Sequence, residues 1–360
     1  MQIAVAILSF LLIVIIHELG HFFAAKACGI YVKEFAVGMG PVIFRKKGKE
    51  TEYVIRLLPI GGSCSMEGED GGYEPEFDSE GNPVEPPVNP RAFNRKPVWQ
   101  RMIVILAGPV MNLILGFFVV LLSVCTSSAV GSTTISDFRT DPVSCASLQV
   151  DDKILAIDGM SVFTASDISY KLQSSDRKND EGNLVFDIKV KRGGETVLLR
   201  DVEFMTTTRE DGSTGIYFDF YVYRLEKNLA NVIGQSFLES CSTGRLIIMT
   251  LFDMLRGKYG INELSGPVGV VSTVSQSVSY GFSTFAYFVS LISINVGVFN
   301  LLPIPALDGC RFLFLLVEAV RRKPTRPEVE GMVHFVGFAL MMVLMLVVTV
   351  NDVMRLANGG

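Results

Sequence analysis

The chain has 360 residues, 49% of them hydrophobic and 19% charged, and its mean hydropathy is +0.39. This composition excludes an ordinary soluble protein and fits a polytopic α-helical membrane protein with a water-facing domain. The net charge of −5, without a basic patch interleaved with aromatic residues, argues against nucleic acid as a partner. The six cysteines form no Cys-x-x-Cys pair, so the sequence indicates neither a disulfide framework nor a zinc knuckle.

Residues 1–28 are predicted to form the first of four transmembrane helices, because about 20 apolar residues cross a hydrocarbon core of ~30 Å. A cleaved signal peptide is the alternative, but the start Met1-Gln2 lacks the basic residues that open such peptides. Within this helix His17 and His21 share one face, with Glu18 beside them. The His-Glu-x-x-His pattern is typical of zinc metalloproteases, in which the glutamate is the general base.

The other explanation of this pattern is a pair of histidines that only pack in a helix and hydrogen-bond to their neighbours. Polar groups in a membrane-length apolar segment are costly and are usually retained for a function. We therefore favour a metal site.

Residues 29–64 change to β-branched and aromatic runs, which predict a membrane-associated β-hairpin or small sheet that ends at Gly61-Gly62. The hairpin is either a plain connection or an edge strand near the metal that pairs with an extended substrate. Residues 65–98 are predicted to form an acidic cytoplasmic loop, because they are rich in Asp, Glu, Gly and Pro.

Residues 99–126 are predicted to form the second transmembrane helix. Its Asn112 either bonds a neighbouring helix or contacts a substrate. Residues 130–225 are polar enough for one small α+β domain, with Asp167 as the expected N-cap of a short helix and a hairpin towards its end. Residues 226–280 are predicted to be an amphipathic linker region at the membrane surface.

Residues 281–310 are predicted to form the third transmembrane helix, which must open at Pro303 and Pro305 because proline cannot continue a regular helix. Asp308 follows directly, and a carboxylate beside unwound backbone in a membrane is a candidate functional group. The third histidine, His334, is expected to be an interface residue rather than a ligand. The remaining segments are a cytoplasmic segment and the fourth transmembrane helix, residues 311–331 and 332–351.

Lysine and arginine residues gather in the loops 29–98 and 311–331, and the positive-inside rule places both loops in the cytoplasm. Both termini and the domain 130–225 are then extracytoplasmic, in a multi-pass protein of the cell inner (plasma) membrane. The histidine pair and the third-span carboxylate come to the same depth. The sequence therefore predicts one metal site whose protein ligands are His17, His21 and Asp308.

These motifs together resemble the site-2 protease family of intramembrane zinc metalloproteases, and most closely its bacterial regulator-of-sigma-factor (anti-sigma-factor protease) branch. The matching segments cover nearly the whole chain: His17–His21, Gly38–Pro41, Pro59–Gly62, Phe93–Pro97, Ala107–Asn112, Ser265–Pro267 and Asn300–Gly309. The resemblance implies Zn²⁺ as the cofactor, Glu18 as the catalytic acid and base, and Asn295 and Asn300 close to the bound substrate. We extend the expected substrate contacts to Gly38 and Gly40.

The resemblance also implies a PDZ domain at residues 130–225, although Asp151-Asp152 stands where a Gly-Asp pair is common and no Gly-Leu-Gly-Phe loop is visible. It further implies cleavage of the transmembrane segments of single-span membrane proteins that an upstream site-1-type protease has already trimmed. Anti-sigma factors are the expected substrates, with remnant signal peptides as a further class, in regulated intramembrane proteolysis.

Two other functions use the same residues differently. A membrane metal transporter or metallochaperone would use the ligand set as a transit site, but a tight tetrahedral site suits transit poorly and no His-rich tract accompanies it. A catalytically silent scaffold would act through its PDZ-like domain, but it would have no use for an intact Glu18 and Asp308.

Overall fold

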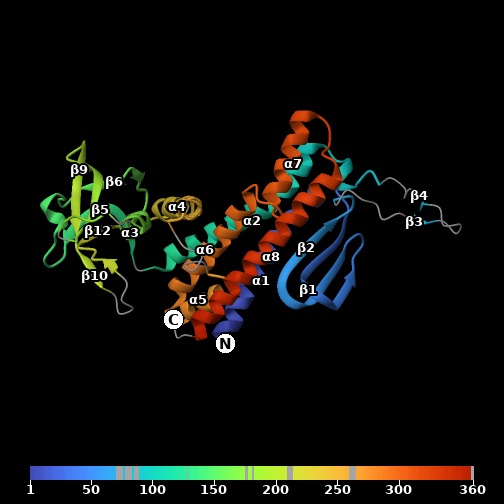
Figure 1. Cartoon of the computed structure of the whole chain (residues 1–360), viewed down its shortest axis with the longest axis horizontal. Helices are drawn as coiled ribbons and strands as arrows, with labels where there is room; N and C mark the ends of the chain where they lie inside the picture. Colours follow the sequence, from blue (N-terminus) through green and yellow to red (C-terminus); the bar gives the residue numbers. More distant parts are fainter. Residues whose placement is uncertain are drawn as a thin grey trace. The chain divides into compact units, whose positions relative to one another are not determined.

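The computed structural model describes residues 1–69, 76–77, 83–84, 89–127, 129–174, 177–180, 182–208, 214–258 and 265–357. These residues form two compact units, Met1–Val119 with Ile247–Gly360, and Val120–Leu246, which we call the membrane unit and the inserted unit. Figure 1 shows the elements of each. Much of the expected acidic loop, residues 65–98, lies outside the described residues.

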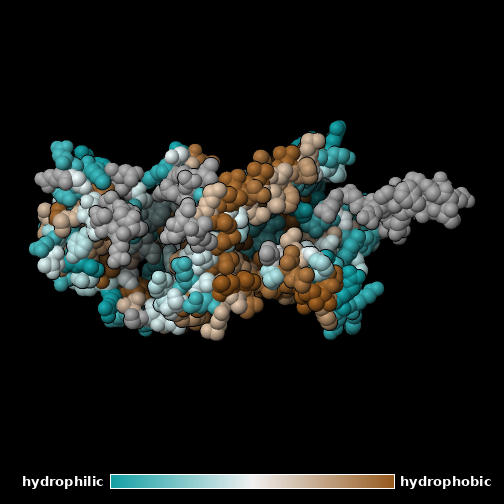
Figure 2. Space-filling view, turned by 60° about the horizontal axis from the view of Figure 1, so that its bottom comes forward, coloured by the Kyte–Doolittle hydropathy of each residue, from teal (hydrophilic) through white to brown (hydrophobic). Residues whose placement is uncertain are grey.

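Among the described residues, four helices are long and apolar enough to cross a membrane, as the sequence predicts. They are α1 (Gln2–Ala27), α2 (Val98–Thr126), α6 (Phe282–Leu301) and α8 (Pro327–Ala357). Helix α8 begins earlier than the predicted residue 332, because Pro327 suits a first helical turn that also holds Glu328 and Glu330. Figure 2 shows apolar side chains gathered over the helices of the membrane unit.

Small residues let α1, α2 and α6 approach closely. A Cβ added to Gly20 of α1 would lie 2.3 Å from the carbonyl oxygen of Ala107 in α2. A Cβ on Gly116 of α2 would lie 2.4 Å from the Ile294 side chain of α6. Such contacts replace the hydrophobic driving force that membrane helices lack, and they set the positions from which the site residues project.

The polar region after α1 forms strands β1 (Val32–Lys47) and β2 (Glu52–Met66). Both strands bend, and their register divides them into four segments in the spatial order 42–47, 52–56, 32–37 and 62–66. The prediction that Gly61-Gly62 ends the sheet is wrong, because β2 continues to Met66. Gly61 has a φ of 78°, so the glycines turn the strand instead of stopping it.

The helical conformation is interrupted after α6, as Pro303 and Pro305 require. Helix α6 ends at Leu301, and Asp308 is the first residue of α7 (Asp308–Arg321), so the segment predicted as 311–331 begins as a helix. Ala306 has a φ of 71° in the connection. A shorter helix, α5 (Pro267–Ser279), precedes α6. At the start of α5, the N–H groups of Gly266 and Gly269 donate hydrogen bonds to Asp352 of α8.

Between the end of α2 and the start of α4 (Leu229–Leu255), the described residues of the inserted unit form the short helix α3 (Ala165–Gln173) and an antiparallel sheet. Its strands follow the order β12-β5-β6-β8-β9, with β7 beside β6. The elements are β5 (Val130–Phe138), β6 (Lys153–Ile157), β7 (Met160–Ser161), α3 (Ala165–Gln173), β8 (Leu184–Arg192), β9 (Glu195–Phe204) and β12 (Phe220–Leu225). The predicted hairpin is β8–β9, and the core includes the fully buried Phe186 and Phe204.

One expectation about this part of the chain needs correction. Asp167 is not the N-cap of α3: Thr164 holds that position, and Asp167, three residues later, completes a capping box by accepting from the Thr164 N–H. The region predicted as an amphipathic linker, residues 226–280, contains α4 (Leu229–Leu255), a single helix of 27 residues.

The remaining short elements are β3 (Glu76–Phe77), β4 (Pro83–Val84), β10 (Thr206–Thr208), β11 (Thr214–Ile216) and the 3-10 turns Phe93–Arg95 and Ser144–Ala146.

Candidate metal centre

The two histidines of α1 lie together near the C-terminal end of the helix. Because His17 and His21 are one helical turn apart, both imidazoles point to the same side, and their Nε2 atoms are 3.2 Å apart. His21 is buried, and His17 is partly buried. Two imidazole nitrogens at this distance repel each other through their lone pairs unless a proton or a cation lies between them.

Asp308 supplies the third atom from the start of α7. Its Oδ2 lies 3.1 Å from Nε2 of His17 and 3.4 Å from Nε2 of His21. This oxygen is buried and accepts no hydrogen bond of acceptable geometry within the described residues. A buried carboxylate oxygen without a donor is costly, so the site is incomplete as a set of protein groups alone.

A single metal ion fits this arrangement. The three ligand atoms all lie within 4.8 Å of one another. Tetrahedral zinc with bonds of about 2.0–2.1 Å to nitrogen and oxygen holds its ligand atoms about 3.3 Å apart, which matches the three separations. Two neutral imidazoles and one carboxylate form a donor set that is common in catalytic zinc sites, with a fourth position left for water or substrate.

One face of α2 forms the wall behind the two histidines. Nδ1 of His21 donates to the backbone carbonyl of Val104 at 2.8 Å, and the side-chain amide of Asn112 lies 3.2 Å from Nδ1 of His17. Between them, a Cβ on Gly108 would lie 2.2 Å from Nε2 of His21. Residues 104, 108 and 112 are four apart, so a single helical face makes all three contacts.

Glu18 lies between this site and the last segment of β2. It interacts electrostatically with both histidines and Asp308, and the backbone of Cys64 hydrogen-bonds to its carboxylate. A Cβ on Gly62 would lie 2.9 Å from Cγ of Glu18, so glycine lets the strand pass this close. Burial raises the pKa of the Cys64 thiol to about 12.

The other predicted site residues are not in the histidine–aspartate cluster. The Gly38 backbone meets the carbonyls of Leu58 and Arg56 at the bend of β1, and the Gly40 carbonyl accepts from Arg56. Asn300 donates to the carbonyl of Val296 in its own helix, and Asn295 is half-buried in the same helix.

His334 also stands outside the cluster, as expected of an interface residue: its Nδ1 accepts from the Ala306 N–H at 3.1 Å.

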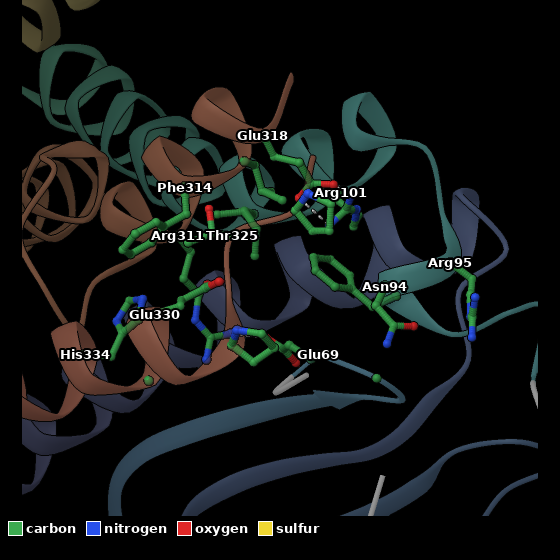
Figure 3. A pocket seen from close by; sticks show the side chains of 17 residues that line it. Glu69, Asn94, Arg95, Arg101, Arg311, Phe314, Glu318, Thr325, Glu330 and His334 are labelled. Carbon is green, nitrogen blue, oxygen red and sulfur yellow. Dashed lines mark hydrogen bonds and ion pairs between the residues drawn. The ribbon is translucent and has the colours of Figure 1, made fainter. Parts of the chain in front are cut away.

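A separate cavity of about 640 Å³ lies beside α7 and the start of α8 (Figure 3). Its charged side chains pair across it: Arg101 with Glu318 at 2.5 Å, and Arg311 with Glu69. None of the three cluster residues lines this cavity, so the cavity and the candidate metal centre are distinct.

Sequence reasoning singled out the clustered residues but missed the groups behind them. The Val104 carbonyl belongs to the backbone, so no residue type signals it. Gly108 appears in a recognisable motif, but only the structure assigns it the space that the His21 ring needs. The contact of Cys64 with Glu18 depends on the strand continuing past Gly62, against the sequence prediction.

Comparisons with known proteins find similarity over nearly the whole chain. The model of peptidase family M50 matches residues 5–344. The chain is 34% identical to the zinc metalloprotease RasP of Shouchella clausii, across 96% of this chain and 97% of that protein. It is 33% identical to the RasP of Oceanobacillus iheyensis (97% and 98% covered) and 32% identical to the regulator of sigma-W protease RasP of Bacillus subtilis (97% of each covered).

Proposed function

The chain belongs to peptidase family M50 and is an intramembrane zinc metalloprotease of regulated intramembrane proteolysis, and we propose that His17, His21 and Asp308 hold its metal while Glu18 is the catalytic acid and base. The observation that carries this assignment is the convergence of three ligand atoms from α1 and α7 around one point, within 4.8 Å of one another. The family argues against a metal transporter and a silent scaffold.

The mechanism follows from the positions of these groups. Zinc, when bound, supplies a Lewis acid that polarises the scissile carbonyl and activates water near neutral pH. Glu18 takes a proton from the attacking water and later delivers it to the leaving amine. The hydrogen bond from the Cys64 backbone holds the carboxylate in place between these two transfers.

The last segment of β2 is the substrate-binding strand in this proposal. Residues 62–66 pair with 32–37 on one side, and within the described residues no further strand pairs with the other side. Gly62 and Cys64 lie beside Glu18, so a chain paired with this edge would pass the catalytic carboxylate. Substrate helices must unwind to pair, which favours segments that contain helix-weakening residues. Gly38 and Gly40 then shape the sheet, and Asn295 and Asn300 line the substrate side.

We place the two termini and the inserted unit outside the cytoplasm, in a cell inner (plasma) membrane. The arginine and lysine residues of loops 29–98 and 311–331 support this orientation through the positive-inside rule. Helix α4 supports a position at the membrane surface, because it exposes Ile233, Phe237 and Phe252 while burying Gln235, Ser236 and Ser242. This is the reverse of a helix that faces water.

The inserted unit is a PDZ-like domain in this proposal, and it excludes substrates that keep a bulky ectodomain. Its antiparallel sheet with one packed helix supports the assignment. The name of the Bacillus subtilis relative, regulator of sigma-W protease, supports anti-sigma factors as substrates, and we extend these to remnant signal peptides. Single-span proteins trimmed by a site-1-type protease are the substrate class.

The test is the variant Glu18→Gln in the purified full-length protein with a single-span model substrate. Cleavage should fall at least about 100-fold because the proton carrier is lost, while zinc content stays at the wild-type level. The control is Glu50→Gln, which changes an exposed carboxylate paired with Lys26 and Arg91. Undiminished cleavage by Glu18→Gln would refute the base assignment.

A further inference from the structure

Asn112 is completely buried in the middle of α2, yet only one of the two polar atoms of its side chain has a hydrogen-bond partner among the described residues. Its amide lies 3.2 Å from Nδ1 of His17, and its Oδ1 is buried without a hydrogen-bond partner among the described residues. A buried amide oxygen without a donor is unusual and calls for an explanation. The contact with a predicted metal ligand provides one.

His21 shows how a hydrogen-bond partner at Nδ1 determines which ring nitrogen carries the proton. Its Nδ1 faces the carbonyl of Val104 at 2.8 Å, and a carbonyl can only accept. A neutral His21 must therefore carry its proton on Nδ1, and its Nε2 lone pair then faces the cluster with Asp308. The hydrogen bond to α2 fixes both the tautomer and the orientation of the ring.

His17 needs the same tautomer, because its Nε2 is also the atom in the cluster, 3.1 Å from Oδ2 of Asp308. The proton must then lie on Nδ1, where it requires an acceptor. With the nitrogen of Asn112 facing Nδ1, two donors would meet. A half-turn of the amide exchanges its oxygen and nitrogen without changing its shape, brings Oδ1 to Nδ1–H, and gives this oxygen the partner that it lacks.

The backbone of Asn112 is held independently of this exchange. Ser293 of α6 donates its hydroxyl to the Asn112 carbonyl at 2.8 Å, and Gly116 lets the two helices approach one turn further on. The side-chain amide can therefore turn while the backbone of Asn112 keeps its position. Notably, α2 supplies both acceptors, one from the backbone at Val104 and one from the side chain two turns later.

We propose that Asn112 is a positioning residue that accepts a hydrogen bond from Nδ1 of His17 and thereby keeps Nε2 free to bind the metal. This inference rests on the proposed ligand set. It assigns the polar residue in the middle of α2 to the metal centre rather than to helix packing or to the substrate.

The test compares zinc affinities of the full-length protein in detergent, measured by competition with a chromogenic chelator. Asn112→Leu keeps the approximate size but removes the acceptor, and it should weaken zinc binding about 10- to 100-fold. Asn112→Asp keeps an acceptor and should bind within about threefold of the wild type. Ser293→Ala is the packing control, since it removes only the bond to the Asn112 backbone, and it should bind like the wild type.

A wild-type measurement tests, without a variant, the His17 tautomer that the proposal requires. The chain has three histidines, so ¹⁵N-histidine labelling gives a spectrum simple enough to assign. Zinc-loaded protein should show His17 protonated at Nδ1. Protonation at Nε2, wild-type affinity in Asn112→Leu, or an equal loss in Asn112→Asp would each overturn the proposal.

His17→Ala separates this inference from the ligand set on which it rests. If His17→Ala binds zinc like the wild type, the ligand set itself is wrong. If His17→Ala loses zinc and Asn112→Leu does not, only the role of Asn112 is wrong.

Discussion

The inserted unit and the membrane unit treat buried carboxylates in opposite ways. In the inserted unit, Asp152 accepts from the guanidinium of Arg192 at 2.6 and 2.8 Å and from the Gln149 N–H. Asp219 of that unit accepts from the N–H groups of Val143 and Ser144 and from the Ser144 hydroxyl. In the membrane unit, Oδ2 of Asp308 faces two imidazole nitrogens and accepts no hydrogen bond from the described residues.

We infer from this difference that Asp152 and Asp219 are structural carboxylates and that Asp308 is a functional one. A buried carboxylate with a full set of donors is stable as it stands and fixes the local fold. A buried carboxylate oxygen that accepts no hydrogen bond keeps the full cost of its burial until a cation or a proton compensates it. The proposed ligand set accounts for this difference, because a divalent cation at the site would compensate the carboxylate of Asp308.

The largest effect expected from this comparison is that of Asp308→Asn. The amide has no negative charge and binds zinc poorly, so zinc affinity should fall at least about 100-fold, and cleavage with it. Elemental analysis of the purified variant after dialysis against a weak chelator measures the loss. Wild-type zinc content would remove Asp308 from the ligand set.

Asp152→Asn should give the opposite result. Zinc content should stay unchanged, while the inserted unit loses about 2–3 kcal/mol of unfolding free energy, because the charge that pairs with Arg192 is gone. The value is set below that of a fully buried pair because Arg192 is 29% exposed. Hydrogen exchange within this unit measures the change, and protection equal to the wild type would contradict it.

Gly108→Ala should have a smaller effect on the metal centre. The added Cβ would lie 2.2 Å from Nε2 of His21, so the ring must move away from its position. Zinc affinity should fall about tenfold, within the range seen when groups around a ligand are disturbed. Gly331→Ala in α8 is the matched control, because its Cβ meets nothing within 4 Å. Equal affinities in the two variants would show that α2 does not position the ligand.

The smallest effect is expected at Glu50, far from any catalytic role. Hydrogen bonds from Arg91 and then Lys26 lower the pKa of this exposed carboxyl from 4.5 to about 2. A lowered folded-state pKa means that the stabilisation is complete above pH 4.5 and disappears as the pH falls towards 2. The difference in Tm between wild type and Glu50→Gln should therefore narrow over that interval. A difference that stays constant would show that the pairs contribute nothing.

The sequence could predict the features that depend on long runs or local spacing. Apolar runs of membrane length predicted the four spanning helices, and the i, i+4 spacing of His17 and His21 predicted their common face. The contact with Asp308, distant in sequence, was predictable only because charge patterning put it at the same depth.

Features that depend on tertiary packing could not be predicted. Glycine pairs usually end strands, but Gly61-Gly62 bends β2 and allows it to pass Glu18. Asp167 suits an N-cap by residue type, but Thr164, three residues earlier, is the N-cap, and Asp167 is the N3 residue of the capping box. The acceptor for His21 is a backbone carbonyl, which only the close approach of α1 and α2 reveals.

X-ray absorption at the zinc edge of the purified full-length protein tests the central claim most directly. Two imidazole nitrogens and one carboxylate oxygen should surround the zinc at about 2.0–2.2 Å, with no sulfur ligand, and the spectrum should change in Asp308→Asn. A sulfur shell at about 2.3 Å, or a spectrum unaltered by that substitution, would contradict the proposed metal centre.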